Sequence, residues 1–318
     1  MGQTVLVLGT GGTIAGVGDG PDALRYAAAQ LSVEQLVAAV PALSDFILDV
    51  QQVAQVDSKD MDWAVWQVLA RALREGLARD DVAGVVITHG TDTLEETAYL
   101  LHRLVDVAKP VVLTAAMRPA TSAQADGPRN LLDAVRLVNE AARTGVHGVC
   151  AVMAGRVWSA RAVRKAHSWH IDDAFDGGGQ DPLALMGHDG LLGSLPAWPQ
   201  ACGAGWSVLL DHAQPRVDIV VSHAGADGRL LDAALRSPDT MPEGVVVACT
   251  GHGTVHHQLE QVLFHAERLG VQVWRSTRVA RGGVQRRDGD IWPAAGEVTV
   301  AQARVALMLE LLGVPAED

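Results

Sequence analysis

Valine-rich apolar runs alternate with helix-forming stretches along this 318-residue chain. The runs lie at 4–8, 82–88, 111–115 and 146–153, and return at 217–221, 244–249 and 271–274. Between the first two runs, residues 61–79 place apolar side chains at helical spacing, and a final helix is expected near 301–312. Strands alternating with helices predict an α/β fold with a mostly parallel sheet and helices on both faces.

The stretch 176–216 differs from the rest because glycine and proline interrupt any regular period. We expect it to be irregular and to end in a linker at 191–216. This divides the chain into a larger N-terminal α/β domain, residues 1–190, and a smaller C-terminal α/β domain, residues 217–318. A chain of this length can fill two hydrophobic cores.

Composition and charge narrow the classes of partner. With 48% hydrophobic and 19% charged residues, we expect a soluble globular protein. A net charge of −12 without a cluster of Lys and Arg argues against a nucleic-acid partner. We expect no membrane partner. The first residues enter a strand directly, which favours a cytoplasmic protein; a leader removed before this sequence begins stays an open alternative.

Cysteine and histidine give no sign of a metal centre. Cys150, Cys202 and Cys249 are isolated, so neither a disulfide framework nor a zinc site is indicated. We find no histidine paired with a carboxylate at metal-ligand spacing, and the dense run 252–257 is interpreted as a chance surface cluster. We therefore expect no metal and no cofactor.

Two threonine loops follow predicted strands. Residues 10–16 (TGGTIAG) follow the run 4–8, and residues 88–97 (THGTDTLEET) follow the run 82–88. In an open parallel sheet, loops at the carboxyl ends of strands line the ligand crevice. The first loop offers the hydroxyl of Thr13, and the second offers Thr91 with the carboxylate of Asp92 beside it. This pairing indicates acyl transfer through a hydroxyl nucleophile.

These loops have other interpretations. A dinucleotide loop is disfavoured because the third glycine of GxGxxG falls on Ile14, and no GK[ST] follows. Thr13 and Thr91 could instead be helix N-caps. Thr93 and Glu96 have the spacing of a capping box, which predicts a helix that starts beside the second loop.

Three further side chains have two possible roles. Tyr26 follows a glycine-rich segment, 16–21, with the composition of a hinged lid, and its phenol could take the hydroxyl proton of Thr13. Lys165 lies among other cations and could be a solvated surface residue or a base toward a hydroxyl. His89 is interpreted as a structural hydrogen-bonding residue, and not as a general base.

These features together resemble the bacterial-type L-asparaginase family, also called the asparaginase/glutaminase family. The matching segments are 10–16, Tyr26, 57–61 (DSKDM), 88–97, 115–119 (AAMRP), 121–131 and Lys165. The resemblance implies a flavodoxin-like larger domain and a smaller C-terminal domain. It also implies a homodimer or homotetramer with sites near the subunit interfaces, and hydrolysis of L-asparagine to L-aspartate and ammonia without a cofactor.

The resemblance also implies roles for single residues. Thr13 would be the nucleophile and Tyr26 its partner on the lid. Thr91, Asp92 and Lys165 would form a second polar set that orients or activates a nucleophile or water.

It likewise implies substrate contacts. Ser58 and Asp92 would hold the α-carboxylate and α-amino groups, and the main chain near Ala116 would touch the amide. Lys59 stands where relatives commonly carry glutamine, and its ammonium either reaches the site or extends to solvent. The turn 251–254 (GHGT) replaces a Gly-Asn-Gly-Asn-like turn, and Asp288 and Asp290 are the acids nearest in sequence to the one that usually supports the tyrosine.

Two alternative functions remain. One is a related hydrolase acting on glutamine or on another amide or ester. The other is a non-catalytic module that binds aspartate in the same crevice. Ammonia release from asparagine separates the first function from the last.

Overall fold

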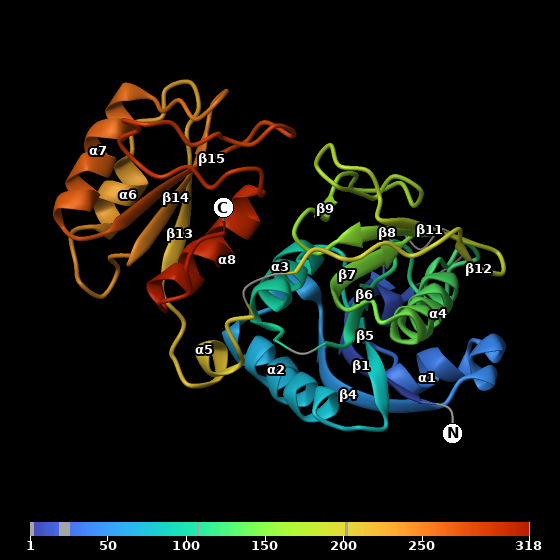
Figure 1. The fold of residues 1–318 in the computed structure, drawn as a ribbon. Helices are drawn as coiled ribbons and strands as arrows, with labels where there is room; N and C mark the ends of the chain where they lie inside the picture. Colours follow the sequence, from blue (N-terminus) through green and yellow to red (C-terminus); the bar gives the residue numbers. More distant parts are fainter. Residues whose placement is uncertain (1–2, 19–25, 107, 201–202, 318) are drawn as a thin grey trace. The chain divides into compact units, whose positions relative to one another are not determined.

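The chain forms two compact units, residues 1–211 and 212–318, in the computed structural model drawn in Figure 1. The structure describes residues 3–18, 26–106, 108–200 and 203–317. Each unit has its own sheet and its own core.

The larger unit is built on an eight-stranded sheet with the order β12-β11-β8-β7-β6-β5-β1-β4. The parallel strands are β4 (Leu48–Val56), β1 (Thr4–Gly11), β5 (Val82–Thr88), β6 (Pro110–Thr114) and β7 (Gly148–Met153). The antiparallel strands are β8 (Arg156–Ser159), β11 (Ala184–Gly187) and β12 (Gly190–Leu192). The prediction of a mostly parallel sheet is therefore confirmed.

Helices cover both faces of this sheet (Figure 1). They are α1 (Val33–Ala38), α2 (Trp63–Leu77), α3 (Leu94–Leu104) and α4 (Gly127–Thr144), with a short α5 (Ser207–Leu210). Val5 and Val7 pack with α1 and α4 in one buried cluster. Leu6 points to the opposite face, where a Cβ on Gly76 of α2 would lie only 2.2 Å from its Cδ2. Alternation along β1 thus supplies both cores.

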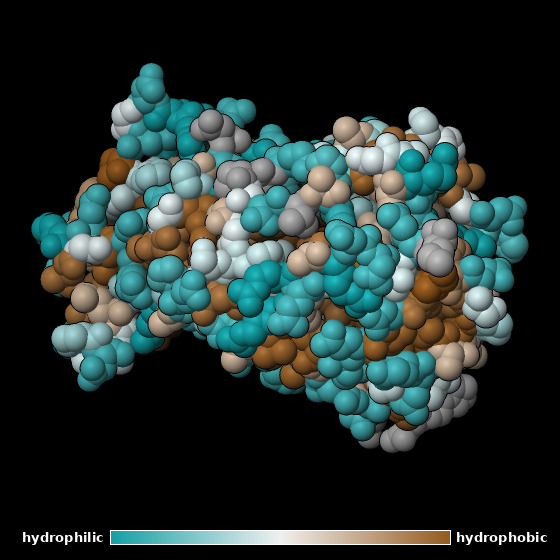
Figure 2. Space-filling model, turned by 60° about the horizontal axis from the view of Figure 1, so that its bottom comes forward, coloured by the Kyte–Doolittle hydropathy of each residue, from teal (hydrophilic) through white to brown (hydrophobic). Residues whose placement is uncertain are grey.

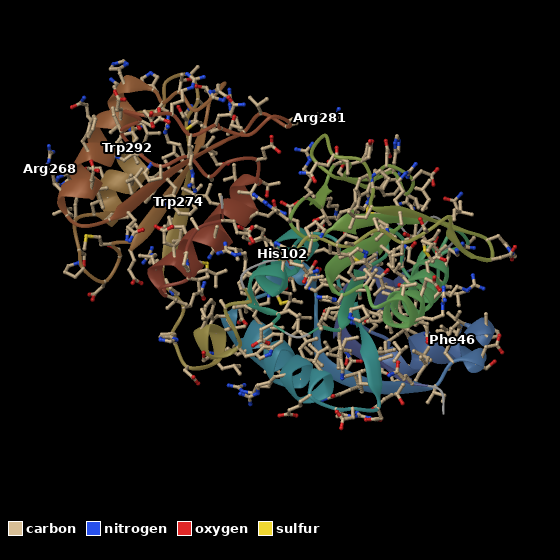
Figure 3. The ribbon with its side chains drawn as sticks, in the orientation of Figure 1. Phe46, His102, Arg268, Trp274, Arg281 and Trp292 are labelled. Atoms are coloured by element: carbon tan, nitrogen blue, oxygen red, sulfur yellow. The ribbon has the colours of Figure 1, made fainter. Side chains whose placement is uncertain are left out.

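Shorter elements connect the sheet to its loops. They are the 3-10 turns η1 (Thr13–Ala15), η2 (Pro41–Asp45) and η3 (Ser58–Asp60), and the two-stranded pairs β2 (Val17–Gly18) with β3 (Tyr26–Ala27) and β9 (Arg164–Lys165) with β10 (Phe175–Asp176). Phe46, labelled in Figure 3, follows η2 and packs against the cluster of α1 and α4.

Two sequence-based expectations are wrong in detail. The stretch 176–216 is not irregular throughout, because β11 and β12 form a hairpin on the edge of the sheet. Gly187 and Gly190 flank the turn of this hairpin, and Gly190 has φ 128°. The interval 191–216, predicted as a linker, contains the end of β12 and α5. Strand β4 was not predicted, because polar glutamines interrupt its apolar pattern on a half-buried edge strand.

The helix predicted beside the second loop is α3, but the capping box is absent. Thr93 stands at the N-cap position without a capping side-chain hydrogen bond. Its hydroxyl instead donates to the carbonyl oxygen of Ser58 at 2.8 Å. Thr93 therefore joins this loop to η3.

The smaller unit is a three-stranded parallel sheet with the order β13-β14-β15. Its elements are β13 (Val217–Val221), α6 (Arg229–Ala234), β14 (Gly244–Cys249), α7 (His257–Arg268), β15 (Gln272–Thr277) and α8 (Val300–Leu311). Trp292, labelled in Figure 3, is buried and tilts onto Phe264 with ring centroids 5.0 Å apart. The predicted smaller α/β unit is confirmed.

The surface mixes hydrophilic and hydrophobic residues, and Figure 2 shows the hydrophobic ones in separate patches. Among the described residues, no helix combines the length and the apolar character needed to span a lipid bilayer.

The capping box of α8 gives a test of the smaller unit. The hydroxyl of Thr299 accepts from the N–H of Gln302 at 3.1 Å, and Oε1 of Gln302 accepts from the N–H of Thr299 at 3.0 Å. We expect Thr299→Ala to lower the free energy of unfolding by about 1 kcal/mol, measured by urea titration. Thr299→Ser keeps the capping oxygen and is the control. Equal losses in both variants would contradict the role of the cap.

Candidate active site

The two threonine loops meet backbone to backbone. Gly12 has φ 80°, and a Cβ on it would lie 2.4 Å from Cα of Gly90. A Cβ on Gly90 would lie 2.3 Å from Oγ of Ser58. Only glycine allows this approach without displacement. The ends of β1 and β5, which are neighbours in the sheet, therefore bring residues 10–16, residues 88–97 and Ser58 to one place.

Thr13 and Tyr26 form a hydroxyl pair. Oγ1 of Thr13 and the phenol oxygen of Tyr26 are 2.8 Å apart, and either oxygen can be the donor. Thr13 is buried, whereas Tyr26 on β3 is 43% exposed. Thr13 is not an N-cap, because Gly12 holds that position of η1. Part of the predicted lid, residues 19–21, lies outside the described residues.

Thr91, Asp92 and Lys165 form a second group. Nζ of Lys165 donates to Oγ1 of Thr91 at 2.9 Å and to Oδ1 of Asp92 at 2.5 Å. The N–H of Lys165 donates to a carboxylate oxygen of Glu95 at 2.8 Å, which ties β9 to α3. The alternative of Lys165 as a solvated surface residue is wrong, since its side chain is only 21% exposed. Thr91 is not an N-cap either, because Thr93 holds that position.

Ser58 joins this second group, and Lys59 does not. The buried Oγ of Ser58 accepts from the N–H of Asp92 at 3.2 Å, which leaves its hydroxyl hydrogen for another acceptor. Lys59 instead pairs with Asp60 and lies 3.7 Å from a carboxylate oxygen of Asp57, with its side chain 60% exposed. The hydrogen bond that Lys59 donates to the carboxylate of Asp60 raises the pKa of Lys59. The side chain of Lys59 is thus oriented as in the alternative in which it extends to solvent.

The segment around Ala116 is held from below by a buried network. The carboxylate of Asp126 accepts the N–H groups of Met117 and Arg118, each at 2.9 Å. The side-chain amide of Asn130 donates to the carbonyl oxygen of Ala115 at 2.9 Å. Burial raises the pKa of Asp126. The sequence resemblance includes this segment but assigns Asp126 and Asn130 no role. Their spacing of four residues at the start of a helix is the one signal that could indicate such a role.

His89 anchors the second loop from the core. Its Nδ1 lies 2.7 Å from the carbonyl oxygen of Gly90, and its Nε2 lies 3.0 Å from Oγ1 of Thr97. A carbonyl only accepts, so Nδ1 carries the hydrogen and Nε2 accepts from the hydroxyl. Nε1 of Trp66 donates to the same hydroxyl at 2.9 Å. The predicted structural role of His89 is confirmed; its partners Thr97 and Trp66 were missed.

Histidines elsewhere correct one expectation. Nδ1 of His170 lies 3.2 Å from Oδ1 of Asp173, three residues further on, so the expectation that no histidine pairs with a carboxylate at metal-ligand spacing is wrong. The spacing was missed because the two residues share an irregular loop. In the run 252–257, His256 caps α7, accepting from the N–H of Gln258. His256 therefore has a structural role, and the interpretation of the run as a chance surface cluster does not hold for this residue.

Of the two acids named near the C-terminal end, Asp290 has partners in the smaller unit. Asp290 pairs with Arg275 at 2.5 Å, and Arg275 also donates to the carbonyl oxygens of Gly253 and Trp292. This arginine therefore ties the turn 251–254 to residues 290–292.

The group around Gly12 and Gly90 is suited to transfer of an acyl group. It offers one hydroxyl beside a phenol and one beside an ammonium and a carboxylate, on loops held by a sheet. A hydroxyl beside a group that can take its proton is the arrangement that nucleophilic catalysis requires.

Comparisons with known proteins agree with this geometry. The family model "Asparaginase, N-terminal" matches residues 4–192, and "Glutaminase/Asparaginase C-terminal domain" matches residues 216–313. The chain is 35% identical over 316 residues to L-asparaginase 2 of Escherichia coli (strain K12), covering 96% of this chain and 88% of that protein. It is 34% identical to a glutaminase-asparaginase of Acinetobacter glutaminasificans, covering 97% and 95%. A crystal structure of a probable cytoplasmic L-asparaginase from Campylobacter jejuni has 35% identity and a TM-score of 0.90, covering 99% and 96%.

Fold and site together define an α/β protein whose reactive groups lie on loops at the carboxyl edge of a parallel sheet. The chain belongs to the asparaginase/glutaminase family.

The neutral His89 makes stability depend on pH. Burial lowers its pKa from about 6.5 to about 4. The unfolded chain therefore takes up a proton that the folded chain refuses, so stability is full above about pH 6.5 and declines as the pH falls toward 4. We expect His89 to account for a loss of roughly 2 kcal/mol between about pH 7 and pH 5 in urea unfolding.

The matched variant is His89→Gln, which keeps an amide donor and acceptor but cannot take up the proton. We expect the free energy of unfolding of this variant to fall less steeply over the same pH range. The same slope in both proteins would contradict the assignment, because the other histidines contribute equally to both.

Proposed function

We propose that this protein hydrolyses L-asparagine to L-aspartate and ammonia, with Thr13 as the nucleophile. The family assignment supports the reaction class. One observation carries the proposal: the 2.8 Å pair of Thr13 and Tyr26 stands on a loop that abuts the loop of Thr91, Asp92 and Lys165.

The reaction follows from what each group can do. Oγ1 of Thr13 attacks the side-chain amide carbon, its proton passes to the oxygen of Tyr26, and the phenol passes its own proton on toward the amide nitrogen. The amide nitrogen takes up a proton and leaves as ammonia, and an ester to Thr13 remains. A water molecule, oriented by Thr91 and Lys165, attacks this ester and releases aspartate, and the proton returns to Thr13.

Substrate binding uses the groups that remain free to act. The hydroxyl hydrogen of Ser58 can be donated to the α-carboxylate, since the oxygen already accepts from Asp92. The carboxylate of Asp92 can accept from the α-ammonium group. The main chain at Ala116, held by Asp126 and Asn130, would contact the amide. A substrate role for Lys59 stays a sequence-based prediction.

Glutamine is the second candidate substrate, because one relative is named a glutaminase-asparaginase. The test is ammonia release by the purified protein from asparagine and from glutamine. Release from asparagine at the higher kcat/KM supports the proposal. Release from neither amide, with aspartate still bound, would favour the alternative of an aspartate-binding module.

We further propose a homodimer or homotetramer and a cytoplasmic location. The solved relative is described as probably cytoplasmic, whereas a relative from Haemophilus influenzae is named a probable periplasmic L-asparaginase. Light scattering coupled to gel filtration tests the oligomer, and fractionation of cells that express the full gene tests the location.

Loss of either threonine hydroxyl is expected to abolish most turnover. We expect Thr13→Ala and Thr91→Ala to lower kcat and kcat/KM together by at least about 10³-fold, because these groups act in the transition state. Thr13→Ser and Thr91→Ser keep a hydroxyl and should retain part of the activity. Rates near the wild-type rate in either alanine variant would refute the assigned role.

Tyr26→Phe separates proton transfer from binding. The ring is kept and the phenol is lost, so we expect kcat to fall by about 10²–10⁴-fold with little change in the Kd of aspartate. Steady-state kinetics and calorimetry measure the two quantities. If kcat changes by less than about threefold, Tyr26 takes no proton in the reaction.

A further inference from the structure

The loop that follows β9 carries three potential metal ligands that the proposed reaction does not use. They are His167, His170 and Asp173, which lie on the projecting segment between β9 and β10 (Figure 1). His167 is half-buried, and the other two residues are exposed. Within the described part of the chain, this is the one group of three such side chains with ligand atoms close together.

The geometry of these side chains is close to that of a coordination sphere. One ligand atom from each residue lies within 4.8 Å of the others. A tetrahedral zinc ion with bonds of about 2.0–2.1 Å places its ligand atoms roughly 3.3 Å apart. Nδ1 of His170 and Oδ1 of Asp173 are already 3.2 Å apart. The rings of His167 and His170 are nearly parallel, with centroids 3.8 Å apart, so His167 has to rotate before its lone pair and that of His170 point at one ion.

The backbone that presents these ligands is held in place. Nη1 of Arg118 donates to the carbonyl oxygen of Trp169 at 2.9 Å, and its guanidinium lies 4.0 Å from the centre of the Trp169 ring. Arg156 donates to the carbonyl oxygen of Asp172. The N–H of Ala166 donates to the carbonyl oxygen of Ala174 at 2.8 Å and closes the loop. Ligands on an anchored loop lose less conformational entropy on binding.

Two features limit the affinity. Nδ1 of His167 accepts from the N–H groups of Trp169 and His170, each at 3.0 Å, and an ion at this nitrogen must replace those donors. Arg118 and Arg156 line a hollow of about 500 Å³ beside His170, and their charges oppose a cation. The carboxylates of Asp172 and Asp173 line the same hollow and offset them, and the hollow has room for water ligands.

We propose that His167, His170 and Asp173 bind one divalent transition-metal ion of the zinc class, with water in the remaining position. Two imidazoles and one carboxylate suit Zn²⁺, Ni²⁺ or Cu²⁺, whereas Mg²⁺ and Ca²⁺ require mainly oxygen ligands. None of the three ligands takes part in the proposed reaction. A failure of the metal-site proposal would therefore not affect the proposed function, and the reverse also holds.

The test is calorimetric titration of the tag-free full chain with Zn²⁺. We expect one ion per chain at this site, and affinity at least about tenfold lower in His170→Ala and in Asp173→Asn. The control is His188→Ala. His188 and Asp189 form an exposed pair at 2.7 Å outside the three-residue group, so this change should leave the affinity unchanged.

A second measurement reports the ligands directly. Co²⁺ in place of Zn²⁺ should give the intense visible absorption of a four-coordinate ion in wild-type protein, and this band should be lost in His170→Ala. Excess Mg²⁺ should not displace Zn²⁺. Zn²⁺ binding that is equal in wild type and His170→Ala, or that Mg²⁺ displaces, would overturn the proposal.

Discussion

The contact between Gly12 and Gly90 is the constraint on which the site depends. The backbones of two neighbouring strand ends approach so closely that a single Cβ would lie 2.4 Å from the opposite Cα. Thr13 lies on one side of this contact and Thr91 on the other. Ser58, from a third segment, packs against Gly90. The distance between the loops, and so the use of two hydroxyls on one substrate, requires glycine at both.

The second loop and the segment near Ala116 are also fixed by buried polar networks. On the second loop, Trp66, Thr97 and neutral His89 form a chain of hydrogen bonds that ends at the carbonyl oxygen of Gly90. Near Ala116, Asp126 and Asn130 do the same for a third segment. Every member of these chains has a defined donor or acceptor role, so the loops have one arrangement and not several. The reactive groups therefore stand on backbone whose geometry the core decides.

The sequence predicted the buried strands well because valine runs such as 82–88 have no other stable location than the centre of a sheet. It also predicted the segments that meet in the site, because loops after parallel strands share one edge. It missed β4, whose glutamines suit an edge strand, and the hairpin of β11 and β12, whose glycines look like breaks. His170 and Asp173 were missed because only the folded loop brings them together. Contacts made by irregular backbone leave no periodic pattern in a sequence.

Thr13 and Tyr26, the hydroxyl pair of the proposed proton transfer, lie on structural elements of different kinds. Thr13 belongs to a turn that continues a central strand. Tyr26 belongs to the antiparallel pair of β2 and β3, in which, among the described residues, Val17 pairs with Ala27 and Gly18 with Tyr26. In the proposed reaction, the fraction of molecules in which this pair of strands is formed would multiply the rate. Substitutions at Val17 or Ala27 would act on this fraction alone and would change turnover without touching substrate. In the proposed reaction, the stability of the pair of β2 and β3 would set how much of the protein is ready to react.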